Sequence, residues 1–203
     1  LEHVGFKYYW SEFNPTQKSE YLEAERTKDE MRDIMSRMIG AEIRYTELGY
    51  WMRQPIYGFR SKSVDTRNGK RLILKPKKDE AQFIIKLFEM RASHMYTNQQ
   101  IADELNSMGF KTRVNLVHDK YDRTVVKKQI GGKKMTAKMI DRYASKLTYC
   151  GILKEKWTYD KAVKAQFDGL VSVELFNEAN RGRIHVDVSS TNEITIREKL
   201  VPE

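Results

Sequence analysis

The chain has 203 residues, of which 40% are apolar and 32% are charged, so it can bury one large or two small hydrophobic cores. No run of residues approaches the roughly 20 apolar positions that a membrane-spanning helix needs, and the first residues lack the pattern of a secretory signal peptide. A single cysteine, Cys150, excludes an internal disulfide and fits a reducing, cytoplasmic compartment.

The net charge of +9 is distributed unevenly along the chain. Residues 53–78 contain nine Lys or Arg and one acidic residue, and residues 111–138 contain nine and two. The rest of the chain has more acidic than basic side chains. Positive charge concentrated in this way is typical of a protein that binds a phosphate backbone. We therefore expect both segments on one side of a folded unit.

The N-terminal third predicts a long helix. Residues 5–10 are an aromatic run with strand character. From about Ser19 to Tyr45 only Gly40 interrupts a helix-forming sequence. Its narrow stripe of Met and Ile side chains requires a partner, which is either another subunit or the core of this chain.

A link over Gly49–Arg60 ends this helix, and a hairpin follows. The Asn68-Gly69 pair is a strong signal for a two-residue turn. It lies between Phe59–Val64 and Arg71–Leu74, which we predict to be the two paired strands.

Two amphipathic helices come next. Residues 79–93 place apolar side chains at helical spacing. Thr97 is a suitable N-cap for a helix over 98–108, and Gly109 is a suitable C-terminal stop. The segment Thr97–Gly109 resembles the early helices of a helix-turn-helix unit.

The stretch Lys111–Leu147 contains most of the second basic segment. It begins with a Lys-rich arm over Lys111–Lys134, which we predict to be a hairpin or wing, and ends with a helix over 136–147. One side of that helix carries Ile140, Tyr143 and Leu147, and the opposite side carries Lys138, Arg142 and Lys146. Such a helix is suited to a groove of nucleic acid, although an ordinary surface helix has the same pattern.

The C-terminal part predicts strands near 151–157 and 162–167, and then a helix over 173–182 capped by Ser172. The chain becomes polar after Ile184, which indicates a linker. The elements together predict an α+β, mainly helical fold: a winged-helix or helix-turn-helix-like DNA-binding domain with small β-hairpins, preceded by a long N-terminal helix.

Catalytic and metal-binding patterns are missing from the sequence. The four histidines are far apart and have no metal-ligand spacing, and there is no phosphate-binding Gly-rich loop and no nucleophile elbow. We therefore expect neither catalytic residues nor a cofactor in this chain.

Several segments, taken in order, resemble one known family. They are Gly49–Arg60 (Gly-Tyr-Trp-Met-Arg-Gln-Pro-Ile-Tyr-Gly-Phe-Arg), Glu80-Ala81 with Ile84, Leu87 and Phe88, then Thr97 to Gly109, Leu147 to Gly151, and Val173 to Ala179. In this order and spacing they resemble the large serine recombinases, which are the integrases and transposases of phages and mobile elements.

The resemblance implies a domain organisation. Residues 1–47 would hold the end of a catalytic domain and its long connecting helix, residues 48–185 the recombinase (DNA-binding) domain, and residues 186–203 a linker toward a C-terminal domain. The nucleophilic serine would lie upstream and a cysteine-rich zinc ribbon downstream, so this segment would bind double-stranded DNA without cutting it. The parent would be a homodimer assembling to a tetramer through residues 19–45. The long insertion before residue 136 departs from an ordinary helix-turn-helix.

A docking arrangement follows for a DNA attachment half-site. In the major groove we expect the helix at 136–147, with these residues facing bases or phosphates: Lys138, Arg142, Ser145 and Lys146. Across the backbone and toward the minor groove we expect Arg53, Tyr57, Arg60 and Lys62. As phosphate contacts we expect Arg113, Lys127, Lys128, Lys133 and Lys134. Each could instead be a solvated surface residue, and Tyr57 a packed linker aromatic.

Two other functions remain open from the sequence. A stand-alone dimeric winged-helix transcriptional regulator would use the same helices. An RNA- or protein-binding module would expose aromatic side chains on a sheet, but Trp51, Tyr57 and Trp157 are more easily interpreted as packing groups.

Overall fold

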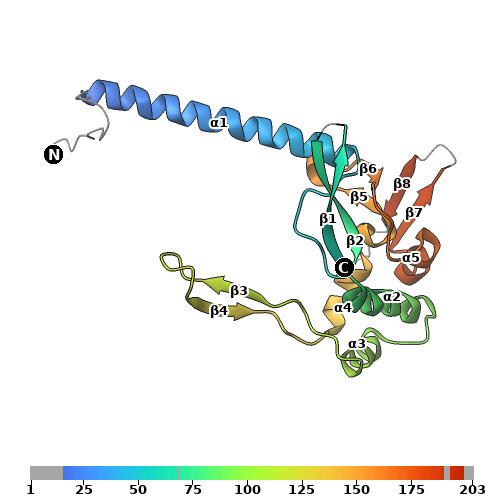
Figure 1. Ribbon diagram of the computed structural model, residues 1–203. Coiled ribbons are helices and arrows are strands. Elements are labelled where there is room, and N and C mark those ends of the chain that lie inside the picture. Colours follow the sequence, from blue (N-terminus) through green and yellow to red (C-terminus); the bar gives the residue numbers. More distant parts are fainter. Residues whose placement is uncertain (1–15, 68, 190–192, 199–203) are drawn as a thin grey trace. The chain divides into compact units, whose positions relative to one another are not determined.

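A computed structural model of the chain describes residues 16–67, 69–189 and 193–198. The chain divides after Arg44 into two compact units. Most of helix α1, which spans Gln17–Glu47, belongs to the first unit (Figure 1). This confirms the predicted long helix, whereas the strand predicted at residues 5–10 lies outside the described residues.

Helix α1 begins where Thr16 Oγ1 accepts a hydrogen bond from the Ser19 N–H at 3.3 Å. Its large apolar side chains are between 44% and 66% exposed, and these are Leu22, Met31, Ile34, Met35, Met38 and Ile39. The stripe is therefore accessible to a partner.

The second unit is built around four helices: α2 (Lys78–Ala92), α3 (Asn98–Ser107), α4 (Ala137–Ala144) and α5 (Val173–Asn180). Their inward side chains share one hydrophobic core. Its fully buried members include Ile84, Leu87, Phe88, Ile101, Leu105, Ile140 and Phe176. This packing of amphipathic helices stabilises the unit, because each apolar face is removed from water.

The predicted helix caps are present. Thr97 and Gln100 form a reciprocal capping box at the start of α3. Ser172 accepts a hydrogen bond from the Leu175 N–H at 3.2 Å at the start of α5. Both caps supply acceptors for amide groups that have no partner within the helix.

Four separate two-stranded antiparallel hairpins accompany these helices in the described residues. They are β1 (Phe59–Thr66) with β2 (Gly69–Pro76), β3 (Asn115–His118) with β4 (Val126–Ile130), β5 (Ile152–Lys154) with β6 (Ala162–Lys164), and β7 (Ile184–Val188) with β8 (Ile194–Glu198). Short 3-10 helices span Leu147–Cys150 and Lys156–Thr158. The hairpins predicted from the Asn-Gly pair and in the arm are confirmed.

The structure corrects the predicted linker. Ile184–Val188 and Ile194–Glu198 pair as the strands β7 and β8, and Val186 is only 2% exposed. The side chain of Asn177 in α5 bonds both the amide and the carbonyl of Val186, at 2.8 and 2.9 Å. Apolar residues alternate along both strands, which is the pattern of strands with one face toward the core.

Cys150 directly precedes the first of the predicted C-terminal strands. It ends the 3-10 helix and is buried, and its thiol lies 3.0 Å from the carbonyl oxygen of Leu147. Burial raises the pKa of this thiol to about 12. The thiol is therefore protonated at neutral pH and packs as a small apolar group.

The fold is thus α+β and mainly helical, as predicted. Helices α3 and α4 pack against each other, but the arm rather than a turn of about 3–4 residues connects them. In Figure 1 the arm, in yellow-green, extends away from these two helices.

Candidate nucleic-acid interface

Helix α4 has one buried side and one basic side. Ile140 and Tyr143 are 0% and 7% exposed and pack in the core, while Lys138 and Arg142 are exposed. The amides of Met139 and Ile140 bond the Thr136 carbonyl, which starts the helix. The predicted division of this helix into an apolar and a cationic side is therefore present in the structure.

The end of α4 differs from the prediction. The helix stops at Ala144, with Ser145 as its C-cap, instead of continuing to Leu147. Lys146 has extended backbone angles and precedes the 3-10 helix, so its side chain does not continue the row of Lys138 and Arg142. Ser145 is exposed, and its hydroxyl bonds the Arg142 carbonyl at 3.3 Å. The row of cations on the helix is therefore two residues long.

Asp141 holds α4 in place from its middle. Its Oδ1 lies 2.9 Å from Arg91 Nη2 and 3.4 Å from Arg183 Nη1, and its Oδ2 lies 2.9 Å from Asn98 Nδ2. Arg91 is only 4% exposed and also donates to the Ala179 carbonyl at 2.7 Å. Charge-assisted hydrogen bonds from α2 and from the start of α3 thus orient α4.

Three cations gather on the outer face of the β1–β2 hairpin. Arg60 lies opposite Lys75 in the strand register, and Lys62 lies two residues along β1, so all three side chains point to one face. Each is exposed. The nearby Lys62 amine, and then Arg60, lower the pKa of Lys75. We call this group the hairpin cation cluster; an anion bound there would relieve the repulsion among its charges.

Arg53 and Tyr57 already have partners in the chain. The guanidinium of Arg53 lies 3.9 Å from the ring centroid of Trp157 and 3.6 Å from a Glu155 carboxylate oxygen, although half of its side chain is exposed. Tyr57 packs on Phe110, with ring centroids 5.0 Å apart, and burial raises its pKa. Tyr57 is thus a packed aromatic, the alternative that the sequence left open.

Arg113 is not a free phosphate contact. Its guanidinium forms an ion pair with the buried Glu80 and donates to the carbonyls of Pro55 and Ile56 at 2.6 and 3.1 Å. It also donates to the Phe59 carbonyl. These bonds fix the base of the arm to the start of β1, so the structure corrects the predicted role of Arg113.

The arm lysines differ in their availability. Lys127 forms an ion pair with Asp119. Lys128, Lys133 and Lys134 are exposed, and no ion pair to them is found within the described residues. The backbone amide of Lys133 bonds the Thr112 hydroxyl at 3.0 Å, which fixes the backbone but leaves the amine available.

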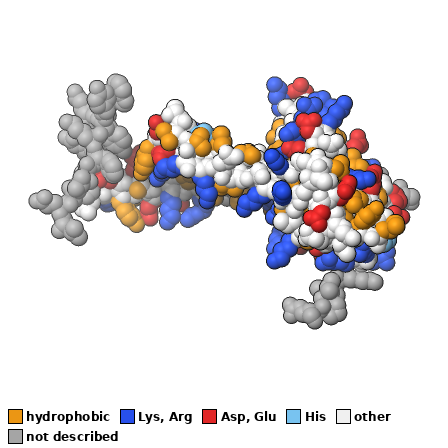
Figure 2. Space-filling model, turned by 90° about the horizontal axis from the view of Figure 1, so that it is seen from below, with side chains coloured by type: hydrophobic (Ala, Val, Ile, Leu, Met, Phe, Trp, Pro, Cys, Tyr) orange, Lys and Arg blue, Asp and Glu red, His pale blue; other side chains and the backbone are white. Residues whose placement is uncertain are grey.

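The basic groups do not form one patch on the face shown in Figure 2, where blue Lys and Arg side chains occur at several separate places on the larger body. Three basic surfaces result: α4, the arm and the hairpin cation cluster. The last two originate near each other, because Arg113 at the base of the arm bonds the carbonyl of Phe59 at the start of β1.

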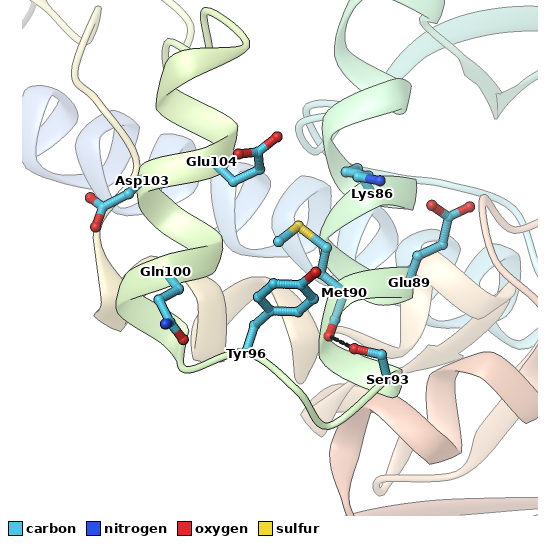
Figure 3. Close-up of a pocket in the computed structure, with 8 residues that line it drawn as sticks. All are labelled: Lys86, Glu89, Met90, Ser93, Tyr96, Gln100, Asp103 and Glu104. Carbon is cyan, nitrogen blue, oxygen red and sulfur yellow. Dashed lines mark hydrogen bonds between the residues drawn. The ribbon is translucent and has the colours of Figure 1, made fainter.

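A groove of about 720 Å³ lies between α2 and α3 and is mainly acidic (Figure 3). The residues that line it are Lys86, Glu89, Met90, Ser93, Tyr96, Gln100, Asp103 and Glu104. Three carboxylates with one lysine would repel a phosphate backbone, so we exclude this groove from the interface.

The sequence did not identify several residues that contribute to these surfaces. Lys75 joins the hairpin cation cluster only through the strand register, in which Thr66 pairs with Gly69 and Arg60 lies opposite Lys75. Arg91 and Asp141 position α4 across 50 residues of sequence, and no local pattern indicates such a pair.

Within the described residues, no group of His, Cys, Asp or Glu could hold a metal ion. None of the helices in this part of the chain is both long and apolar enough to cross a membrane.

Comparisons with known proteins give limited matches. No protein-family model and no curated protein matches the chain. Two solved structures are similar over 71% of the chain, each with 17% sequence identity and a TM-score of 0.47. They are described as "Crystal Structure of a LSR-DNA Complex" and "Sequence Requirements of the Listeria innocua prophage attP site". The chain covers 38% and 50% of those proteins. At this TM-score the likeness adds no weight to the proposals below.

Proposed function

We propose that the second unit is a sequence-specific DNA-binding domain of a site-specific recombinase of the large serine family, and that α4 docks in a major groove. The two-sided structure of α4 carries this proposal. Its eight residues extend about 12 Å, comparable to the width of the major groove. Ile140 and Tyr143 anchor it, and Asp141 fixes its orientation, while Lys138 and Arg142 face outward.

In this proposal Arg142 reads the sequence. A guanidinium can donate two parallel hydrogen bonds to one guanine edge, whereas a lysine amine acts as a point charge. Lys138 and Ser145 contact neighbouring bases or phosphates. Lys146 is half-buried and lies beyond the end of α4, so we assign it a phosphate contact and no base contact.

The phosphate backbone is held by the other two basic surfaces. Lys128, Lys133 and Lys134 on the arm and the hairpin cation cluster supply affinity without sequence preference. Arg53 can join them only by exchanging its contact with Glu155 for a phosphate. Tyr57 and Arg113 act indirectly, since they support the core and the arm.

Helix α1 supplies the subunit contact in this proposal. Its exposed Met and Ile stripe has the spacing of a helix-packing surface, and a second copy of the helix would cover it. The parent recombinase would be a dimer that assembles to a tetramer, encoded by a bacterial or phage mobile element. Its nucleophilic serine would lie outside this sequence. A dimeric transcriptional regulator would share α1 and α4, but it would not exchange DNA strands.

A binding experiment tests the docking of α4. Duplexes are selected by the 203-residue chain from a random pool, and their affinity is measured for the wild type and for Arg142→Ala. We expect a loss of about 1–3 kcal/mol and a relaxed preference at one base pair. Lys161→Ala removes one exposed charge outside the three basic surfaces and should have little effect. If Arg142→Ala retains both affinity and preference, α4 is not the reading helix.

A further inference from the structure

The arm is a two-stranded ribbon whose faces are both exposed. Strands β3 and β4 pair antiparallel, with Asn115 opposite Ile130 and a register shift after Val117. All nine of their residues are exposed, so no other described element covers either face. A two-stranded ribbon of this kind normally requires further packing.

The base of the arm is fixed to the core. Arg113 is bound to Glu80, and the Glu80 carboxylate also accepts a hydrogen bond from the Gly58 amide at 2.9 Å. Opposite it, Gly131 has a φ of +108°, and a Cβ there would lie 1.9 Å from the Arg113 carbonyl oxygen. Only glycine permits this close approach. These contacts therefore hold both sides of the arm together at its base.

The tip of the arm, residues 119–125, has its own internal bonds. Asp119 Oδ1 accepts hydrogen bonds from the backbone amides of Tyr121 and Asp122 at 2.7 and 3.2 Å. Asp122 Oδ1 accepts a hydrogen bond from the Thr124 amide at 2.8 Å. Asp119 also pairs with Lys127. The two acidic side chains of the tip are thus used to shape the loop.

What the tip presents outward is one aromatic ring between two cations. The side chain of Tyr121 is 90% exposed, and Lys120 Nζ lies 5.6 Å from its ring centroid. Arg123 follows two residues later and is exposed. Aromatic rings stack on bases, cations bind phosphates, and DNA-bending proteins use such wedges in the minor groove.

The charge of the arm decides which partner fits. Eight Lys or Arg lie between residues 111 and 134, against Asp119 and Asp122 alone. A second copy of the arm would repel it, whereas DNA complements it. From Thr112 to Tyr121 the ribbon can reach roughly 30 Å, or about nine base pairs.

We propose that the tip of the arm is a second DNA contact, in which Tyr121 inserts between base pairs from the minor groove while Lys120 and Arg123 bind the flanking phosphates. The length of the ribbon lets this site lie up to about nine base pairs from the base of the arm. This inference rests on the proposed DNA-binding function, and it extends the footprint beyond the groove that α4 occupies.

The test uses the selected duplex and the 203-residue chain, with hydroxyl-radical footprinting and permanganate reactivity of thymines as readouts. Wild type should protect two regions and make one thymine near the outer region reactive through unstacking. Tyr121→Ala should lose the outer protection and that reactivity, and weaken binding roughly 5- to 100-fold. Tyr121→Phe should retain the outer protection, the thymine reactivity and the affinity, because the ring rather than the hydroxyl stacks on the bases.

The outcomes separate the two proposals. If Tyr121→Ala changes none of these readouts while Arg142→Ala weakens binding, the tip is not a DNA contact but the proposed function stands. If Tyr121→Ala changes only the sedimentation of the chain, the tip contacts protein and the inference is wrong. If the wild type selects no duplex, the proposed function itself fails.

Discussion

The guanidinium of Arg91 in α2 lies 2.9 Å from the carboxylate of Asp141 in α4, and it joins the hydrophobic core to the helix that we propose reads DNA. The arginine side chain is 5% exposed and the aspartate side chain 41%. The ion pair therefore fixes α4, whose outer side is open to a ligand, against α2 in the core.

Removing Asp141 should loosen α4. Asp141→Ala leaves the Arg91 guanidinium buried without its charged partner, although the carbonyl of Ala179 remains. We expect the free energy of unfolding to fall by about 1–3 kcal/mol in urea titrations, with weaker DNA binding. Asp103→Ala, an exposed change on α3, should stay within about 0.5 kcal/mol. Equal stability of the two variants would contradict a role for Asp141 in holding α4.

The Glu80 network should make stability depend on acid pH. Burial alone would raise the pKa of Glu80, but hydrogen bonds from Arg113, Lys77 and the Gly58 amide outweigh it and hold the pKa below its ordinary value. A carboxylate with a lowered pKa stabilises the folded state above its unfolded pKa, and this contribution is lost as the pH falls through the folded pKa. Urea midpoints of the wild type should therefore fall below about pH 4.5. Glu80→Gln should show a flatter profile, and an unchanged profile would contradict the network.

Two lysines of the arm should differ in their effect on the salt dependence of binding. Lys133→Ala should reduce the slope of log K against log salt by about one and weaken all duplexes alike. Lys127→Ala should change the slope less, because Lys127 is already paired with Asp119. Fluorescence anisotropy at several salt concentrations measures both slopes. Identical slopes for the two variants would show that the ion pair of Lys127 opens on binding.

The β7–β8 hairpin should contribute to folding. Val186→Ala creates a small cavity at a site that is 2% exposed, and we expect a loss of about 1–2 kcal/mol in the free energy of unfolding. Val188→Ala makes the same change on the same strand where the side chain is 43% exposed, and it should cost much less. Thermal or urea unfolding compares them. A linker in this region would predict no difference.

Self-association should depend on the stripe of α1. Met35→Glu places a charge on an exposed apolar position and should lower the mass measured by sedimentation equilibrium toward that of the monomer. Ser36→Glu adds the same charge one residue away, off the stripe, and should leave the mass unchanged. If the wild type is itself monomeric at every concentration, the proposed contact is wrong for this chain.

Local pattern was sufficient for the helices and for two of the hairpins. Ile140 and Tyr143 follow the period of a helix, and Thr97 with Gln100 has the composition of a capping box. Such features depend on residues within one or two turns. The end of α4 was misplaced because Leu147 continues the apolar spacing, although the chain has already entered a 3-10 helix.

The roles of individual cations were less predictable. The sequence predicts a phosphate contact for Arg113, but its partners Glu80 and Pro55 are 33 and 58 residues away. Lys75 belongs to the hairpin cation cluster because strand pairing places it opposite Arg60. Composition does not distinguish a free cation from one that is bound within the chain.

The sequence by itself determined where helices begin, where the chain turns and which segments are rich in positive charge. These features depend on neighbouring residues and on the backbone conformational preference of each residue type. The tertiary structure decided which of the charged groups are available. Long-range ion pairs such as Arg91 with Asp141 and Arg113 with Glu80 form only when distant elements pack. Desolvation and geometry, rather than residue type, then determine whether a cation supports the fold or faces a ligand.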